Sequence, residues 1–246
     1  MDIALDPARN PARRDPIAEE LAALGLSPAA ASLFRDTLAA RDGLLLIVGA
    51  EGSGRTTTLE AARRLRPDGD ALTFDGIDDP ENARRALGAA SSGRFVVAAM
   101  RACDAVGAIV RLRALSADPF QVAAALRAAF AQRLARRLCH RCRKPVQASR
   151  DASARLGFDP GMVVHVPVGC AICGGSGYVS RFGLFEAIAV DPPMRPLIER
   201  GDAAIIAGQA FRGGPDLAGA ARAMVKVGEI SAEDAVRLSR RPDQLP

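Results

Sequence analysis

The chain has 246 residues, of which 49% are hydrophobic and 25% charged, with a net charge of +5 at pH 7. This hydrophobic fraction excludes a disordered chain, and the longest apolar run, residues 44–50, is far shorter than the roughly 20 residues of a transmembrane helix. Because the N-terminus alternates acids, arginines and prolines without an apolar segment, we expect no signal peptide and a soluble, cytoplasmic protein.

The first part of the chain, residues 1–40, is predicted to be an arm followed by helices. Residues 1–18 contain three prolines among mixed charges, which favours a loose arm. Between Ile17 and Ala40, apolar residues recur at helical spacing, which indicates one or two amphipathic helices. Ser27 and Pro28 interrupt this pattern and mark a break.

Residues 41–138 have the alternating pattern of an α/β core. Strands are predicted at residues 44–48, 71–74 and 94–100. Helices are predicted at residues 56–65, 79–91, 104–115 and 118–138. Because strands and helices alternate along this region, we expect a mainly parallel sheet flanked by helices.

A phosphate-loop motif joins the first predicted strand of this core to its first helix. The segment GAEGSGRT matches the pattern G-x(4)-G-K-[ST], except that Arg55 replaces the lysine. Glycines let the backbone curl, so that successive N–H groups and the helix N-terminus can surround phosphate groups. The Thr56 hydroxyl could hold Mg²⁺, and a turn without a ligand is the alternative. The predicted nucleotide-binding residues are Gly49, Gly52, Ser53, Gly54, Arg55, Thr56 and Thr57.

Residues 139–180 are predicted to be a loop-rich zinc module. Four of the five cysteines form two C-x-x-C pairs, Cys139 with Cys142 and Cys170 with Cys173. In a cytosolic chain such pairs favour zinc over disulfides, and four thiolates close a tetrahedron without an open catalytic position. The alternatives are a redox pair or unrelated thiols. We interpret His140 and His165 as loop residues and Cys103 as a small core residue.

The last part, residues 181–246, is predicted to contain a returning strand and a C-terminal helical region. The apolar run at residues 181–190 is typical of a strand, and residues 193–240 have helical patterning.

A resemblance to a known family extends over residues 25–240. It begins around the phosphate loop with GLLLIVGAEGSGRTTTLEA. It continues before the first cysteine pair with DAVGAIVRLRALSADPFQVAAALRAAFAQRLARRLCHRC and at the second pair with CAICGGSGYVSRFGLFEAIAVDPPMRPLI. These segments resemble the C-terminal ATPase domain of the secretion ATPases that power type II secretion and type IV pilus assembly. The resemblance implies a reduced RecA-like P-loop NTPase core, a four-cysteine zinc module and a C-terminal helical subdomain.

The sequence departs from the family pattern at catalytic positions. In this alignment Gly76 stands at the Walker B glutamate and Arg101 at a histidine that follows the third strand. Asp75 lies one position early, so its side chain points to the wrong face of the strand. Glu51 adds a negative charge to the loop and is available to pair with Arg55. We also expect the family's acidic segment before Walker B and its large N-terminal domains to be absent.

These departures predict a pseudo-ATPase that binds ATP at most. Phosphoryl transfer needs a lysine, a magnesium ion and a group that orients water, and arginine is not a neutral replacement for that lysine. We therefore expect an interaction or regulatory component of a type II secretion or type IV pilus-like system. The resemblance implies three kinds of partner: secretion or pilus proteins at the inner membrane, an intact motor ATPase, or further copies of this chain. Such partners would make the protein peripheral to that membrane.

Two other functions remain open from the sequence. The first is an active ATPase that uses Asp75, Asp78 or Asp79 to hold the metal. The second is a zinc-dependent nucleic-acid binder, for which the basic residues beside the first cysteine pair are the candidates. These are Arg133, Arg136, Arg137, Arg141, Arg143 and Lys144. Because no aromatic platform accompanies them, and because arginines are spread along the whole chain, we do not expect nucleic-acid binding.

Overall fold

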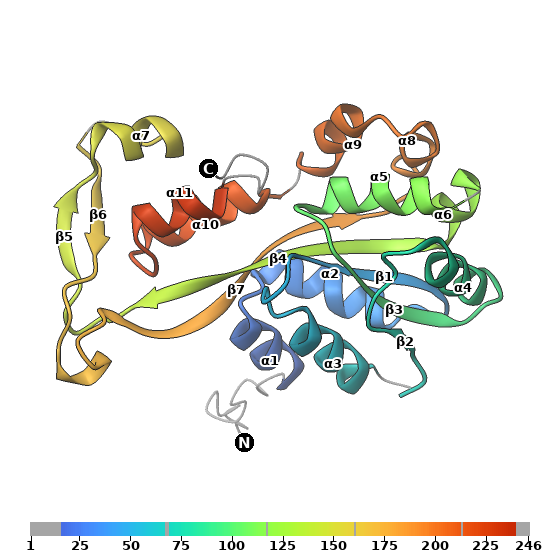
Figure 1. Cartoon of the computed structure of the whole chain (residues 1–246), viewed down its shortest axis with the longest axis horizontal. Coiled ribbons are helices and arrows are strands. Elements are labelled where there is room, and N and C mark those ends of the chain that lie inside the picture. The colour runs from blue at the N-terminus through green and yellow to red at the C-terminus, as the bar shows by residue number, and fades with distance from the viewer. Residues whose placement is uncertain (1–15, 67–68, 117, 160, 213, 240–246) are drawn as a thin grey trace, which may run out of the picture.

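A five-stranded sheet with the order β2-β3-β1-β4-β7 organises the molecule (Figure 1). The structure, a computed structural model, describes residues 16–66, 69–116, 118–159, 161–212 and 214–239, so most of the predicted arm lies outside the described residues. The strands are β1 (Gly43–Val48), β2 (Leu72–Phe74), β3 (Phe95–Met100), β4 (Leu126–Leu138) and β7 (Tyr178–Ala189). The first four run parallel and β7 pairs antiparallel with β4, which confirms the mainly parallel sheet.

Helices cover both faces of this sheet. One face carries α1 (Pro16–Leu24), α2 (Pro28–Leu38) and α3 (Arg55–Leu65). The other carries α4 (Pro80–Ser91), α5 (Ala105–Leu115), α6 (Pro119–Ala125), α8 (Arg195–Arg200), α9 (Ala203–Ala210), α10 (Leu217–Lys226) and α11 (Ala232–Ser239). The predicted break at Ser27 is confirmed, because this residue caps α2 by accepting a hydrogen bond from the Ala30 N–H.

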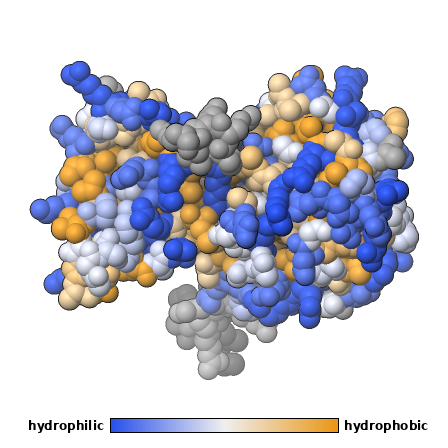
Figure 2. Space-filling view, in the orientation of Figure 1, coloured by the Kyte–Doolittle hydropathy of each residue, from blue (hydrophilic) through white to orange (hydrophobic). Residues whose placement is uncertain are grey.

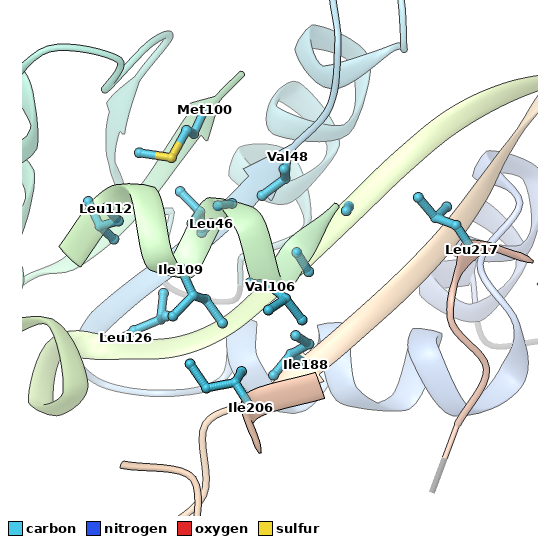
Figure 3. Close-up of a cluster of buried hydrophobic side chains, with 14 of the residues drawn as sticks. Leu46, Val48, Met100, Val106, Ile109, Leu112, Leu126, Ile188, Ile206 and Leu217 are labelled. Atoms are coloured by element: carbon cyan, nitrogen blue, oxygen red, sulfur yellow. The ribbon is translucent and has the colours of Figure 1, made fainter. Parts of the chain in front are cut away.

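The core consists of two hydrophobic layers on opposite faces of β1. Side chains alternate along a strand, so Leu45 and Ile47 pack beside Phe34 and Phe130 on one face. Leu46 and Val48 pack on the other face in the cluster that includes β3, α5 and β7, as Figure 3 shows. All six residues of β1 are buried, which is why this strand was recognisable as a continuous apolar run.

The predicted long helix at residues 118–138 is wrong. Helix α6 ends at Ala125, and the chain continues from Leu126 as β4, which pairs with β1 on one side and β7 on the other. The segment LRAAFAQRLARRL is rich in residues with high helix propensity. Two neighbouring strands nevertheless supply hydrogen bonds and packing that outweigh this local preference.

The strands β4 and β7 form a long ribbon that leaves the core and carries the cysteine-bearing end of the molecule (Figure 1). That end holds β5 (Lys144–Gln147) and β6 (Val163–Val166), which pair antiparallel, together with α7 (Arg150–Leu156) and a short 3₁₀ turn, Ala171–Cys173. It therefore has more regular structure than the predicted loop-rich module. Figure 2 shows hydrophobic residues among hydrophilic ones over this end.

Within the described residues, every single helix is too short or too polar to cross a membrane. Only α1 and α2 taken together meet the length and composition criteria, and the two helices are bent by 119° at their break.

Candidate functional site

The phosphate-loop segment lies at the carboxyl end of β1 and leads into α3. Gly52 and Gly54 have φ angles of 72° and 89°, in the left-handed region that favours glycine. A Cβ atom at Gly49 would collide with the Ser53 hydroxyl oxygen. Gly52 and Gly54 are therefore glycines because of their backbone conformation, and Gly49 is a glycine because a side chain there would meet Ser53. The curled loop leaves the first turn of α3 open to a ligand.

The loop rests on Gln132 of β4, a residue that the sequence reasoning missed. Its Nε2 donates a hydrogen bond of 2.8 Å to the carbonyl oxygen of Ser53, and the two residues are both buried. The Ser53 hydroxyl and the Gln132 Oε1 are buried without a hydrogen-bond partner. The available signal was the single amide side chain, Gln132, at the end of the otherwise apolar run AAFAQ. Because this run was predicted to be helical, the position of Gln132 beneath the loop could not be inferred.

Arg55, which replaces the lysine of the motif, is half-buried at the first position of α3. Desolvation by burial lowers the pKa of its guanidinium, Asp78 and Glu51 oppose this, and Arg101 adds to it. One guanidinium nitrogen, Nη1, is buried without a hydrogen-bond partner. Glu51 acts on Arg55 only through its charge, without an ion pair in the described structure, and Thr56 and Thr57 are exposed.

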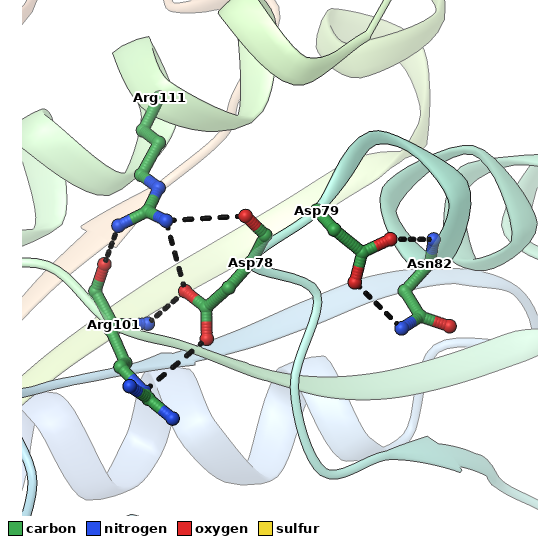
Figure 4. Close-up of polar contacts among 5 residues, drawn as sticks. All are labelled: Asp78, Asp79, Asn82, Arg101 and Arg111. Carbon is green, nitrogen blue, oxygen red and sulfur yellow. Dashed lines mark hydrogen bonds and ion pairs between the residues drawn. The ribbon is translucent and has the colours of Figure 1, made fainter.

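Three parallel strands bring the other catalytic-motif positions to the same edge. Since β3 lies between β1 and β2, Arg101 and the segment 75–79 end beside the phosphate loop. Asp78 Oδ1 accepts a 2.8 Å hydrogen bond from the Arg101 N–H and lies 3.5 Å from Arg111 Nη2, while Oδ2 lies 3.7 Å from Arg101 Nε. Arg111 also donates to the carbonyl oxygens of Arg101 and Asp78, at 2.8 and 3.2 Å (Figure 4). Asp78 is thus held by two arginines.

The two other acids proposed as metal ligands are placed differently. Asp79 caps α4, because Oδ1 and Oδ2 accept hydrogen bonds of 2.9 and 2.8 Å from the backbone and side-chain nitrogens of Asn82 (Figure 4). The bond from the Asn82 backbone is the main cause that lowers the pKa of Asp79. Asp75 is exposed at the end of β2.

The four predicted cysteines converge at the far end of the ribbon. Their sulfur atoms all lie within 4.8 Å of one another. The Sγ–Sγ distances are 3.9 Å for Cys139 and Cys170, 3.8 Å for Cys142 and Cys173, and 3.7 Å for Cys170 and Cys173. A zinc–sulfur bond of about 2.3 Å places tetrahedral sulfur ligands about 3.8 Å apart. The cluster can therefore accept a tetrahedral ion without rearrangement.

Backbone N–H groups support this cluster. Gly169 donates to Cys142 Sγ at 3.3 Å, and Cys170 and Gly177 donate to Cys173 Sγ at 3.1 and 3.2 Å. Desolvation raises the pKa of Cys173, but these two N–H groups and the neighbouring thiols outweigh it and lower the pKa to about 6. For Cys142, desolvation prevails and raises the pKa to about 11. The N–H···S hydrogen bonds therefore favour the thiolate, which is the form that binds metal.

The cysteine cluster is attached to the segment between α10 and α11. The Leu138 N–H donates 2.8 Å to the Glu229 carbonyl oxygen, and the Glu229 carboxylate lies 2.8 Å from His140 Nε2 and 3.2 Å from Arg137 Nη1. His140 is therefore more than an ordinary loop residue, since it joins the first cysteine pair to the C-terminal helices. The pKa of His165 is lowered, mainly by burial and to a smaller extent by the positive charge of Arg143.

The arginines beside the first cysteine pair bind mostly within the molecule. Arg133 donates to the carbonyl oxygens of Leu238 and Cys103. Arg136 donates 2.8 Å to the buried Asp234 and stacks 4.0 Å over the Tyr178 ring. Arg137 pairs with Glu229, and Arg143 donates to the Gly228 carbonyl oxygen. These contacts take up four of the six basic residues that were candidates for nucleic-acid binding.

The interpretation of Cys103 as a core residue is wrong, because the structure exposes it. The strand β3 ends at Met100, and Cys103 falls in the turn before Asp104, which caps α5. A residue that follows a buried strand by three positions is already outside the sheet.

Comparison with known proteins identifies the family to which this chain belongs. A protein-family model described as "Type II/IV secretion system protein" matches residues 62–237, beginning just after the phosphate loop. Type II secretion system protein E of Klebsiella pneumoniae is 30% identical over 226 residues, which cover 74% of this chain and 46% of that protein. Type IV pilus assembly ATPase PilB of Thermus thermophilus is 29% identical over 232 residues, 75% of this chain and 26% of that protein.

The solved structures agree on the fold. The pilus retraction motor PilT with bound ADP has a TM-score of 0.62 at 18% identity, covering 94% of this chain and 68% of that one. The ATPase DotB of Legionella pneumophila has a TM-score of 0.61 at 16% identity, covering 87% and 63%. The chain spans about half the length, or less, of the curated relatives named above. The family match over most of its length shows that this chain belongs to the type II/IV secretion system protein family of ATPases.

Proposed function

We propose that this chain is a nucleotide-binding member of its family that does not hydrolyse ATP, and that it acts as an interaction or regulatory component of a type II secretion or type IV pilus-like system. The proposal depends on one observation, the placement of the carboxylates that follow β2. Asp78 is held by Arg101 and Arg111, Asp79 caps α4, and Asp75 is exposed. Gly76 supplies no side chain at the Walker B glutamate position.

The nucleotide would bind at the phosphate loop. The N–H groups of the curled backbone and the first turn of α3 would contact the phosphates, and the positive end of the helix dipole favours that charge. Arg55 supplies a further positive charge beside them. The predicted binding set therefore remains Gly49, Gly52, Ser53, Gly54, Arg55, Thr56 and Thr57.

Hydrolysis would lack the groups that phosphoryl transfer requires. A water-orienting or proton-accepting residue must lie next to the terminal phosphate. Among the acids considered for this role, each is committed to an arginine pair or a helix cap, or is exposed. Arginine also replaces the lysine, and its forked, longer side chain does not reproduce a compact ammonium group.

Cys139, Cys142, Cys170 and Cys173 would hold a structural Zn²⁺ ion. The sulfur spacing and the N–H···S hydrogen bonds support this assignment. Four thiolates leave no open coordination position, so the ion would stabilise this end of the molecule and take no part in catalysis. The division into a core at residues 41–138 and a zinc module at 139–180 is part of the same proposal.

The proposed partners follow from the family. Its relatives are named for type II secretion and type IV pilus assembly, so we infer that this chain binds proteins of such a machine, an intact motor ATPase, or its own copies. Binding there would make it a cytoplasmic protein at the inner face of the inner membrane.

The test is a calorimetric titration with ATP together with a phosphate-release assay. We expect saturable binding, no Mg²⁺-dependent phosphate release, and loss of binding in Arg55→Ala. Arg63→Ala, an exposed arginine on the same helix, is the matched control and should bind normally. Phosphate release by the wild type that disappears in Arg55→Ala would contradict the proposal and establish an active ATPase.

A further inference from the structure

Two arginines contact one carboxylate next to the phosphate loop, and a third lies close enough to interact with it electrostatically. Arg101 and Arg111 both contact Asp78 (Figure 4), and Arg55 lies within electrostatic range of Asp78 and Arg101. Glu51 also acts on Arg55 through its charge, so the three guanidinium groups exceed the two carboxylates by one positive charge. This edge of the sheet therefore attracts an anion more strongly than a cation.

The residues at this edge do not suit a magnesium ion, although the family implies one. Mg²⁺ requires oxygen ligands in near-octahedral geometry and is usually held by one or two carboxylates together with phosphate oxygens. Both oxygens of Asp78 face arginine groups, and both oxygens of Asp79 accept hydrogen bonds from Asn82. The Thr56 hydroxyl and the exposed carboxylates of Glu51 and Asp75 remain, but no hydrogen bond or ion pair within the described residues holds any of the three in position as a ligand.

Unsatisfied donors in the loop point to an acceptor. The Arg55 Nη1 is buried without a partner, and a buried guanidinium nitrogen without an acceptor is costly. The Ser53 hydroxyl belongs to a residue that is only 7% exposed, also lacks a partner, and faces Gly49 across the loop. A phosphate oxygen is an acceptor that both groups could use.

We propose that this loop binds the phosphate chain of a nucleotide as a metal-free anion, with Arg55 and Arg101 supplying the positive charge that magnesium supplies in an ordinary P-loop site. The inference depends on the proposed nucleotide-binding function and adds the charge state of the ligand. It also accounts for the arginines: a guanidinium group can donate to two phosphate oxygens at once without a bridging ion.

The experiment is a calorimetric titration with ADP as its sodium salt, in excess Mg²⁺ and in buffer without added divalent cation. A chelator is avoided because it would compete for metal at the cysteines. We expect the same Kd in both buffers, within about twofold. Tighter binding by about tenfold or more in Mg²⁺ would overturn the inference and leave the proposed function standing. No binding in either buffer would overturn both.

Two variants test the role of the arginines. Arg101→Ala should weaken metal-free binding by about tenfold. Arg94→Ala removes an exposed arginine at the opposite end of the same strand and should leave the Kd unchanged. The double variant Arg101→Ala/Arg111→Ala releases Asp78 and should acquire Mg²⁺-dependent binding. If Arg101→Ala binds ADP as tightly as Arg94→Ala does, Arg101 has no such role and the inference fails.

Discussion

The two ends of this molecule differ in how much of the family's residue pattern they keep. At the cysteine-bearing end all four ligand positions are present, and their sulfur atoms lie at the spacing of a tetrahedral ion. At the phosphate-loop end the backbone elements are present, but Arg55 replaces the lysine of the motif, and the proposed alignment puts Arg101 at the histidine position and Gly76 at the glutamate position. A loop conformation depends on glycines and strand order, whereas catalysis depends on individual side chains. Under the proposed function, the fold persists at this end without the reaction groups.

The largest expected effect is at the cysteine cluster. Structural zinc contributes on the order of 10 kcal/mol in small zinc domains, so Cys139→Ser should abolish stoichiometric zinc binding and unfold the cysteine-bearing end. The measurement is zinc content by mass spectrometry together with thermal unfolding. Cys103→Ser, a thiol that is exposed and outside the cluster, is the control and should behave as wild type. Unchanged zinc content in Cys139→Ser would show that the two ends do not differ as described.

The next effect concerns how the C-terminal helices are attached to the ribbon. Asp234 is 1% exposed and pairs with Arg136 at 2.8 Å and Arg237 at 3.0 Å. Asp234→Ala should lower the free energy of unfolding by about 2–3 kcal/mol, as measured by chemical denaturation. This loss is smaller than for a fully buried ion pair because both arginines are partly exposed. The neighbouring exposed Glu233→Ala is the control, and equal losses in the two variants would contradict this role.

A smaller effect is expected at the support of the phosphate loop. Gln132→Leu removes the hydrogen bond to the Ser53 carbonyl oxygen and should cost about 1–2 kcal/mol of stability. Because the loop loses its support, ADP binding should weaken several-fold as well. Gln147→Leu, on the exposed strand β5, should change neither quantity. A Gln132→Leu protein with wild-type ADP affinity would show that the loop holds its shape without β4.

The smallest effect is a pH dependence at Glu186, which joins the core to the C-terminal helices. This buried carboxylate accepts hydrogen bonds from the Ala105 and Leu217 N–H groups, at 2.6 and 2.9 Å. Burial is the main cause that raises its pKa. The folded state then binds the proton more tightly than the unfolded state, so stability falls as pH rises from about 4.3 through the raised pKa.

Chemical denaturation across that pH range should reveal this slope, and Glu186→Gln should flatten it. The exposed Glu81→Gln serves as the control and should retain the wild-type slope. A slope that is the same in Glu186→Gln and in the wild type would assign the pH dependence to other groups.

Local sequence determined the parts of the fold whose signals are continuous. The run GLLLIV was recognisable as β1 because it is buried on both faces, and Asp79 and Asp104 were recognisable as helix starts because capping depends on neighbouring residues. The two C-x-x-C pairs predicted a joint site because four soft ligands at that spacing suit one ion, and their sulfur atoms do converge.

The tertiary structure alone decided what depends on residues distant in sequence. Residues 126–138 have helical propensity, and only pairing with β1 and β7 makes them a strand. That strand places Gln132 under the phosphate loop and turns Arg133, Arg136 and Arg137 toward the C-terminal helices. Strand order brings Arg101 to Asp78, and the packing of α5 adds Arg111, so that a charge pattern with no sequence signature lies beside the phosphate loop. Spacing along the chain encodes ligands and caps, whereas pairing across the sheet determines which charges meet.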